Sequence, residues 1–255
     1  MRESTLGRLA HPPIVEAVFD IDCDLPPVHD LNDLEKPAFE LFRNDYPNAQ
    51  KQFVQQYEVR AAAGTPPDFA SHTGRPTIAA LQFLQEDKKQ LVQMRTQGFS
   101  FNRLAPYAGF VAYSDEIRRR WEQYCTIAEP MQVTAIKLRY INRLPLPTAE
   151  GHVQLEEYLE VAPKVPGEEE LTLTGFVQQY AAVDNRTGHG ANIVLTPQRL
   201  DQGKLPIILD IAVSADQKGE PNDWDWIIAT IQSLRELKND IFRRSLTEKC
   251  LMLFR

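Results

Sequence analysis

The chain contains the stretch Val133-Thr134-Ala135-Ile136-Lys137-Leu138-Arg139-Tyr140-Ile141-Asn142-Arg143, in which apolar and cationic residues alternate from Ile136 to Tyr140. Successive side chains of a β-strand point to opposite faces of the sheet, so this stretch predicts a strand with one apolar and one basic face. The apolar face carries Ile136, Leu138 and Tyr140, and the basic face carries Lys137, Arg139 and Arg143. We call these three cations the basic row.

A row of three cations is unusual in a chain of net charge −7 and needs a partner. One candidate is an acidic row on an earlier strand-like run, formed by Glu16, Asp20 and Asp22 with Asp24 beyond them. If the two strands are neighbours in one sheet, opposite charges across them contribute about 0.2–1 kcal/mol per pair. Two alternatives stay open, namely an external anion at the basic row and a divalent cation at the carboxylates.

Hydrophobic periodicity predicts a similar order of elements twice along the chain. In residues 1–129 we expect strand, helix, three strands and helix, at about 13–21, 31–42, 52–62, 77–84, 90–95 and 114–128. In residues 130–255 we expect the same order, at about 131–143, 153–160, 171–183, 191–196, 206–214 and from 223 onward. Short polar turns between strands favour antiparallel sheets.

The sequence therefore predicts an α+β fold of two similar strand-helix-three-strand-helix halves. The halves are 1–129 and 130–255, either as two domains or as one continuous domain, with antiparallel sheets and two long packing helices. The last helix has an apolar stripe that includes the stem of Lys238; its other members are Ile227, Ile231, Leu234 and Ile241. An enclosed apolar cavity between sheet and helix would indicate a small-molecule site, and the sequence leaves open whether that groove is filled.

Composition is that of an ordinary soluble protein, with 43% apolar and 25% charged residues among 255. Three cysteines lie far apart, without metal-ligand or redox-motif spacing, which is typical of a reducing compartment. The N-terminal residues contain no apolar signal-peptide core, and no apolar run is long enough to span a bilayer. We expect a cytoplasmic protein without a membrane partner. The negative net charge disfavours nucleic-acid binding through bulk charge but leaves a local basic patch open.

Linear motifs of common enzymes are missing from the sequence. The five histidines include no pair at the i, i+4 spacing of metal ligands, and we find no nucleophile elbow, phosphate-binding glycine loop or dinucleotide fingerprint. We therefore predict no catalytic residue, no metal and no cofactor, although distant residues can still assemble a site. In Gly188-His189-Gly190 the flanking glycines would leave the histidine ring accessible. We interpret this segment as a hairpin turn with a solvent-exposed histidine.

Aromatic and basic residues mix between positions 95 and 107. Arg95 and Arg103 flank Phe99 and Phe101. Aromatic and basic residues in this pattern can form a platform on which the bases of single-stranded nucleic acid stack. Such aromatic residues are more often part of the hydrophobic core. The run Arg118-Arg119-Arg120 on the expected second helix is interpreted as a solvated face or a partner surface.

Four groups of segments together resemble a family of sporadically distributed, uncharacterised prokaryotic proteins of about this length. They are Pro12-Pro13-Ile14-Val15-Glu16-Ala17-Val18, Phe99-Ser100 with Ala105-Pro106-Tyr107, Leu138-Arg139-Tyr140-Ile141-Asn142, and Leu237-Lys238-Asn239-Asp240-Ile241-Phe242 with Ser245-Leu246-Thr247. The resemblance covers nearly the whole chain. It implies no established activity; the patchy distribution implies a gene that moves horizontally, and hence an accessory, defence-associated or mobile-element-associated role.

These observations predict a non-enzymatic cytoplasmic interaction protein that acts through a protein partner. Its binding surface would be the face of the basic row or the exposed side of the last helix. The first alternative is a nucleic-acid or nucleotide binder, and the second is a metal-dependent hydrolase built on Glu16, Asp20 and Asp22. The candidate binding residues are Lys137, Arg139, Arg143, Arg95 and Arg103.

Overall fold

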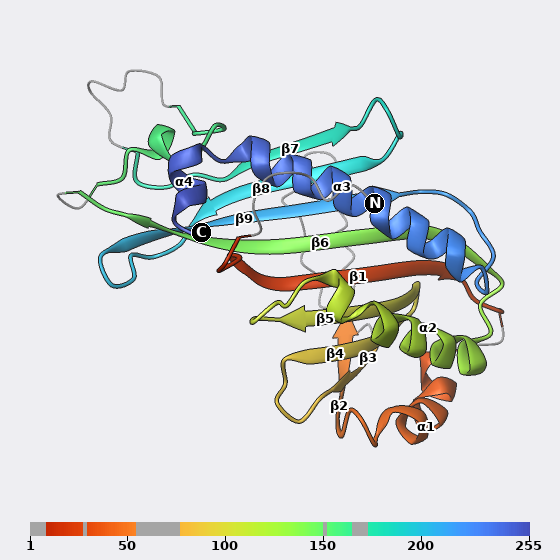
Figure 1. The fold of residues 1–255 in the computed structure, drawn as a ribbon. Coiled ribbons are helices and arrows are strands. Elements are labelled where there is room, and N and C mark those ends of the chain that lie inside the picture. Colours follow the sequence, from red (N-terminus) through yellow and green to blue (C-terminus); the bar gives the residue numbers. More distant parts are fainter. Residues whose placement is uncertain (1–8, 28–29, 55–76, 150–151, 165–172) are drawn as a thin grey trace, which may run out of the picture.

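The computed structural model describes residues 9–27, 30–54, 77–149, 152–164 and 173–255, and shows one antiparallel sheet of nine strands (Figure 1). The strand order is β2-β3-β4-β5-β1-β6-β9-β8-β7. The strands are β1 (Ile14–Asp24), β2 (Asn48–Val54), β3 (Thr77–Leu84), β4 (Gln90–Arg95), β5 (Gly98–Leu104), β6 (Gln132–Pro147), β7 (Gln178–Val183), β8 (Gly190–Pro197) and β9 (Lys204–Ala215).

Three long helices and several short ones accompany the sheet. The helices are α1 (Leu31–Phe42), α2 (Ser114–Ala128), α3 (Trp224–Ser245) and α4 (Glu248–Met252), with 3₁₀ turns η1 (Phe110–Ala112) and η2 (Leu155–Glu157). Asp30 caps α1 by accepting a hydrogen bond from the Asn32 amide, and Asp223 caps α3 by accepting one from the Trp226 amide.

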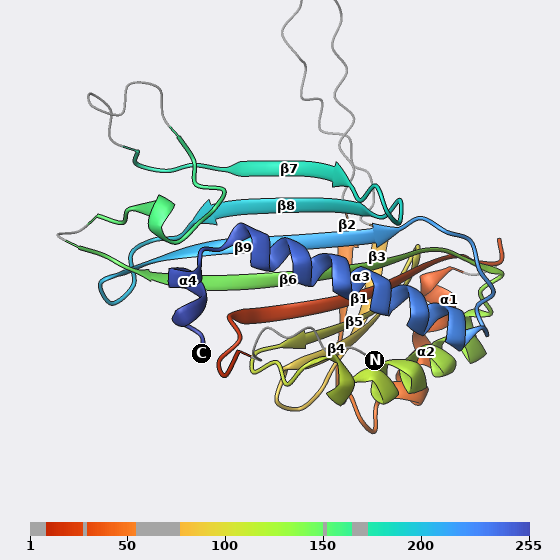
Figure 2. The same cartoon turned by 45° about the horizontal axis from the view of Figure 1, so that its top comes forward.

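Helices α1, α2 and α3 cover one face of the sheet, and α3 runs across β6 and β9 (Figures 1 and 2). Strand periodicity explains this layer, because alternate residues of β1 and β6 point toward the helices and are buried. Phe19 and Leu138 face each other across the β1–β6 ladder on the helix side, and Asp20 and Lys137 face each other on the open side. The core therefore lies between the sheet and the helices, and the charged rows lie on the opposite face.

The expected two halves with separate sheets and two long packing helices are not found, so this prediction is wrong. β1 pairs with both β5 and β6, and β6 pairs with both β1 and β9, which makes the sheet continuous across residues 129 and 130. Pairing of these two strands satisfies backbone hydrogen bonds that two separate sheets would leave at exposed edges. The division into segments 1–129 and 130–255 stays a prediction.

Two further expectations differ from the structure. The expected helix at 153–160 is only the 3₁₀ turn η2, and residues 98–104 form a fourth strand between α1 and α2, where three strands were expected. Gly98 begins β5 with φ 139°, a conformation that glycine adopts readily. It also allows β5 to lie close to β1, because a Cβ added at this position would be 2.2 Å from the Ile21 carbonyl oxygen. Part of the strand expected at 52–62 and the beginning of that at 171–183 lie outside the described residues. In the described chain no helix has the length and apolarity needed to cross a membrane.

Candidate functional site

Each cation of the basic row forms an ion pair within the molecule. Lys137 Nζ lies 2.6 Å from Asp22 Oδ2, and Arg143 Nη2 lies 2.6 Å from Asp201 Oδ2. Arg139 binds Asp210 of β9 through both Nε and Nη2 at 2.5–3.0 Å. The row is therefore neutralised by carboxylates of three different segments, which leaves less net charge for an external anion.

The acidic row on β1 also has partners. Asp22 lies between Lys137 and Arg95, whose Nη2 is 2.7 Å from Asp22 Oδ1. Asp20 accepts a hydrogen bond from Ser100 at 2.5 Å, and Glu16 accepts one from Asn102 at 2.8 Å. Burial raises the pKa of Asp20, although Arg95 opposes the shift. No group of three or more possible metal ligands occurs among the residues placed in the structure.

The arrangement that the nucleic-acid hypothesis requires is not present in the described part of the chain. Arg103 lies on the helix side of the sheet, with its guanidinium 5.2 Å from the Tyr113 ring centroid, whereas Arg95 and the basic row lie on the open side. The two aromatic rings considered for stacking, Phe99 and Phe101, are buried, and so is the Tyr140 ring between the cations of the basic row. The candidate cations therefore do not converge on one face with exposed rings, and their binding role stays a prediction.

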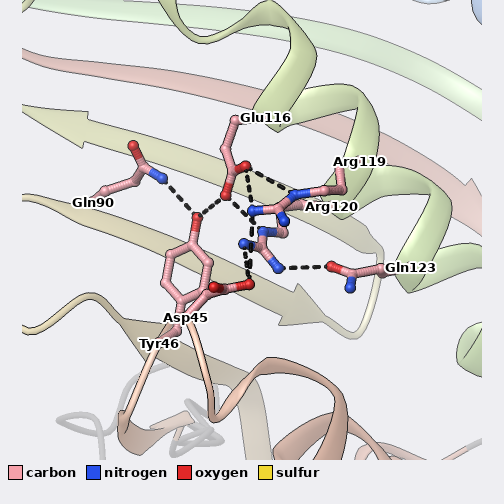
Figure 3. Close-up of polar contacts among 7 residues, drawn as sticks. All are labelled: Asp45, Tyr46, Gln90, Glu116, Arg119, Arg120 and Gln123. Carbon is pink, nitrogen blue, oxygen red and sulfur yellow. Dashed lines mark hydrogen bonds and ion pairs between the residues drawn. The ribbon is translucent and has the colours of Figure 1, made fainter.

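The arginine run on α2 is partly interior. Arg120 is fully buried and donates hydrogen bonds to Glu116, Gln123 and Asp45 at 2.7–2.8 Å (Figure 3). The hydrogen bond from Arg120 holds the pKa of Asp45 below its usual range. The sequence predicts a solvated face or a partner surface for the whole run, but Arg120 belongs to neither. It links α2 to the segment that follows α1.

His189 is buried rather than exposed, so that expectation is wrong. Its side chain is turned toward α3, where Nε2 lies 2.9 Å from Ser233 Oγ. Burial lowers the pKa of His189, which favours the neutral ring beside this hydroxyl. The contact joins the β7–β8 turn to α3.

A cavity of about 520 Å³ lies between β6, α3, the segment before β1 and the loop before η1. Most of its wall is apolar, including Leu9, Pro13, Phe110 and Phe242. The cations in the wall are Arg235, Lys238, Arg243 and Arg255, and no aspartate or glutamate is among the lining residues that the structure describes. The cavity therefore combines an apolar interior with positive charge.

Lys238 is the most unusual residue of this wall. It is 9% exposed, and its Nζ lies 4.0 Å from the centroid of the Tyr140 ring. Its ammonium has no hydrogen bond or ion pair with any described residue. Burial, with the nearby charges of Arg235 and Arg243, lowers the pKa of Lys238 to about 7.

The other cations of the wall differ in their partners. Arg243 pairs with Asp240 at 2.6 Å, and Arg255 pairs with Glu248 at 2.5 Å. Arg235 stacks on Phe110 at 4.4 Å and has no carboxylate partner in the described chain. Arg235 and Lys238 are three residues apart on α3, which places them on neighbouring turns of one helix face. They are two adjacent cations without counter-ions.

The opposite wall supplies hydroxyl groups. The Tyr107 and Tyr140 hydroxyls are 3.1 Å apart, and burial raises the pKa of both. Asn142 is buried beside them and donates to the Leu209 carbonyl at 2.9 Å. Segments far apart in the sequence meet at this cavity, since Pro12, Tyr107, Tyr140, Asn142 and Lys238 all line it.

The sequence contained one signal of this site, which was the lysine on the apolar stripe of the last helix. No protein-family model, curated protein or solved structure matches the chain.

Proposed function

We propose that the protein binds a small organic anion with an apolar body in the cavity between β6 and α3. The observation that carries this proposal is the pair Arg235 and Lys238, which face the cavity without a carboxylate partner among the described residues. Lys238 is buried, and a buried charge without a counter-charge costs several kcal/mol, which an anionic ligand would offset.

The size and lining of the cavity support the same class of ligand. Small-molecule sites are typically about 300–1,000 Å³, mostly apolar, with a few convergent polar groups. At about 520 Å³ the cavity lies within this range. Phe110 and Phe242 offer apolar contacts to the body of the ligand, while Arg235 and Lys238 would hold its carboxylate, sulfonate or phosphate group.

The hypothesis of a protein partner stays a prediction, as do the cytoplasmic location and the accessory role. The basic row supports it less than the sequence indicated, because Lys137, Arg139 and Arg143 are each paired within the molecule. The cavity is a different surface, on the helix side of the sheet.

Anilinonaphthalene sulfonate, a fluorescent organic anion with an apolar body, tests the proposal. We expect saturable binding to the wild-type protein and a loss of affinity of roughly tenfold or more in Arg235→Gln, because a hydrogen bond to a charged group is worth about 1.5–3 kcal/mol. Arg244→Gln is the matched control, since Arg244 is exposed on the same helix and outside the cavity lining.

A neutral apolar dye such as Nile red distinguishes the contribution of the ligand's negative charge to binding from the contribution of its apolar body. Its binding should change little in Arg235→Gln. Equal losses of sulfonate binding in Arg235→Gln and Arg244→Gln, or no loss in either, would contradict an anion site at the cavity.

A further inference from the structure

We propose that Lys238 captures the ligand covalently, as an imine with an α-oxo acid whose carboxylate is held by Arg235. This inference rests on the proposed function, because it names the ligand class of the same cavity. It adds a reactive role for the amine that anion binding alone does not require.

Geometry is the first support. The Lys238 amine lies in the wall of a cavity large enough for a small molecule, and no described carboxylate holds it as an ammonium ion. Two other lysines of the described chain are held as ammonium ions by carboxylates, since Lys137 pairs with Asp22 and Lys249 with Glu157. The hydrogen bond to Glu157 raises the pKa of Lys249, which makes that amine a poorer nucleophile at neutral pH.

Protonation is the second support. Only the neutral amine attacks a carbonyl carbon, and lysines become nucleophilic when they are desolvated or lie beside another cation. Both conditions hold for Lys238, which is buried and has Arg235 and Arg243 on its own helix. With a pKa of about 7, roughly half of the Lys238 amines are neutral at pH 7, whereas a lysine of pKa 10.5 is almost entirely protonated.

Groups on the elements that face the amine fit the same chemistry. The Tyr140 ring of β6 packs on Nζ, and its hydroxyl is 3.1 Å from that of Tyr107 in the facing loop. Burial keeps both phenols protonated near neutral pH, so they can donate to a carbonyl or carbinolamine oxygen. Arg235, three residues before Lys238, is available for the carboxylate of the same molecule.

The reaction balances without an oxidant or reductant. The nitrogen lone pair of Lys238 forms a C–N bond with the carbonyl carbon, which gives a carbinolamine. The C–O bond then breaks, the oxygen leaves as water, and the two hydrogens of that water balance the two lost from the amine nitrogen. The product is an imine that hydrolyses back to the free amine and the oxo acid.

Trapping with sodium cyanoborohydride tests the proposal on the full chain. The protein is incubated with pyruvate or phenylpyruvate and the reductant at pH 7, and the modified peptide is identified by mass spectrometry. Phenyllactate is the matched control ligand, because it keeps the ring and carboxylate but has no carbonyl. Lys238→Arg keeps the positive charge without a primary amine, and Lys218→Met removes an exposed lysine away from the cavity lining.

We expect one predominant adduct, on Lys238, that forms with the oxo acids, is absent with phenyllactate, disappears in Lys238→Arg and persists in Lys218→Met. No Lys238 adduct with either oxo acid would overturn the inference, and so would labelling spread evenly over surface lysines. The proposed function is judged separately by displacement of anilinonaphthalene sulfonate. Displacement by phenylpyruvate and phenyllactate alike, without an adduct, would leave the anion site standing and remove the covalent step.

Discussion

Lys238 and Arg120 are both cations in the interior, but their surroundings differ. Arg120 is fully buried and donates to Glu116, Gln123 and Asp45, so its charge and hydrogen-bonding groups are compensated (Figure 3). Lys238 has an aromatic ring on one side and a cavity on the other. A compensated buried charge is consistent with a structural role, whereas an uncompensated one at a cavity indicates a ligand site.

The burial of Lys238 should destabilise the ligand-free protein. We expect Lys238→Met to raise the free energy of unfolding at pH 7, because methionine fills similar space without a charge. Below pH 7 the lysine is charged in both the native and the unfolded state, and the full cost of burial is present. Urea unfolding of wild type and variant at several pH values measures the effect.

The pH dependence of this difference has a definite sign. Between about pH 7 and 10.5 the unfolded state binds the Lys238 proton more strongly than the native state, so wild-type stability gains up to about 1.4 kcal/mol per pH unit from this residue. Arg235 and Arg243 stay charged over this range, and burial prevents the facing Tyr107 and Tyr140 from ionising. The advantage of Lys238→Met should therefore shrink as the pH rises; an advantage independent of pH would contradict the lowered pKa.

Among the elements, the β1–β6 ladder joins the two parts of the sheet. On its helix side the ladder pairs Phe19 with Leu138, and on its open side it pairs Asp20 with Lys137. The acidic and basic rows meet across it, so the charges help to specify register in addition to the apolar packing.

We predict that Asp22→Asn destabilises the protein by roughly 1–3 kcal/mol, since it weakens charge-assisted contacts to both Lys137 and Arg95. The Asp22 side chain is only 9% exposed, so water replaces these contacts poorly. Urea unfolding gives the change in the free energy of unfolding.

Asp201→Asn is the comparison variant for the same basic row. Asp201 pairs with Arg143, but its side chain is 52% exposed, and such surface pairs contribute about 0–1 kcal/mol. Similar losses in the two variants would show that the position of a pair in the sheet does not decide its contribution.

For the whole molecule, one core includes residues from both sides of position 130. The core cluster contains Phe99 and Trp121 as well as Leu209 and Ile231. Trp121 of α2 also donates from Nε1 to the Pro221 carbonyl at 2.9 Å, just before α3. Contacts of this kind couple the folding of the two segments.

We therefore expect one cooperative unfolding transition. In each of two variants that retain a single tryptophan, either Trp121 in α2 or Trp226 in α3, the urea midpoint by fluorescence should coincide with the midpoint of the same variant by circular dichroism. Different fluorescence and circular-dichroism midpoints within one variant would indicate that 1–129 and 130–255 unfold independently, as two domains would.

The amino-acid sequence by itself determined most of the local elements of this protein, with the turn at η2 and the strand β5 as exceptions. Strand alternation around Lys137 and Arg139, the Asp30 cap of α1 and the apolar stripe of α3 follow from periodicity and side-chain chemistry, and each is present in the structure. These features depend on neighbours only a few residues away.

Only the tertiary structure decided how those elements combine. One sheet forms instead of two because β1 and β6 pair along their length, and the partners of the basic row lie on β1, on β9 and beside it. The cavity depends on segments that are about 30 to 100 residues apart, and the lack of a counter-ion for Lys238 is a property of all the walls together. Strand pairing, side-chain burial and the pairing of opposite charges depend on residues that are distant in the sequence, so no local sequence pattern specifies them.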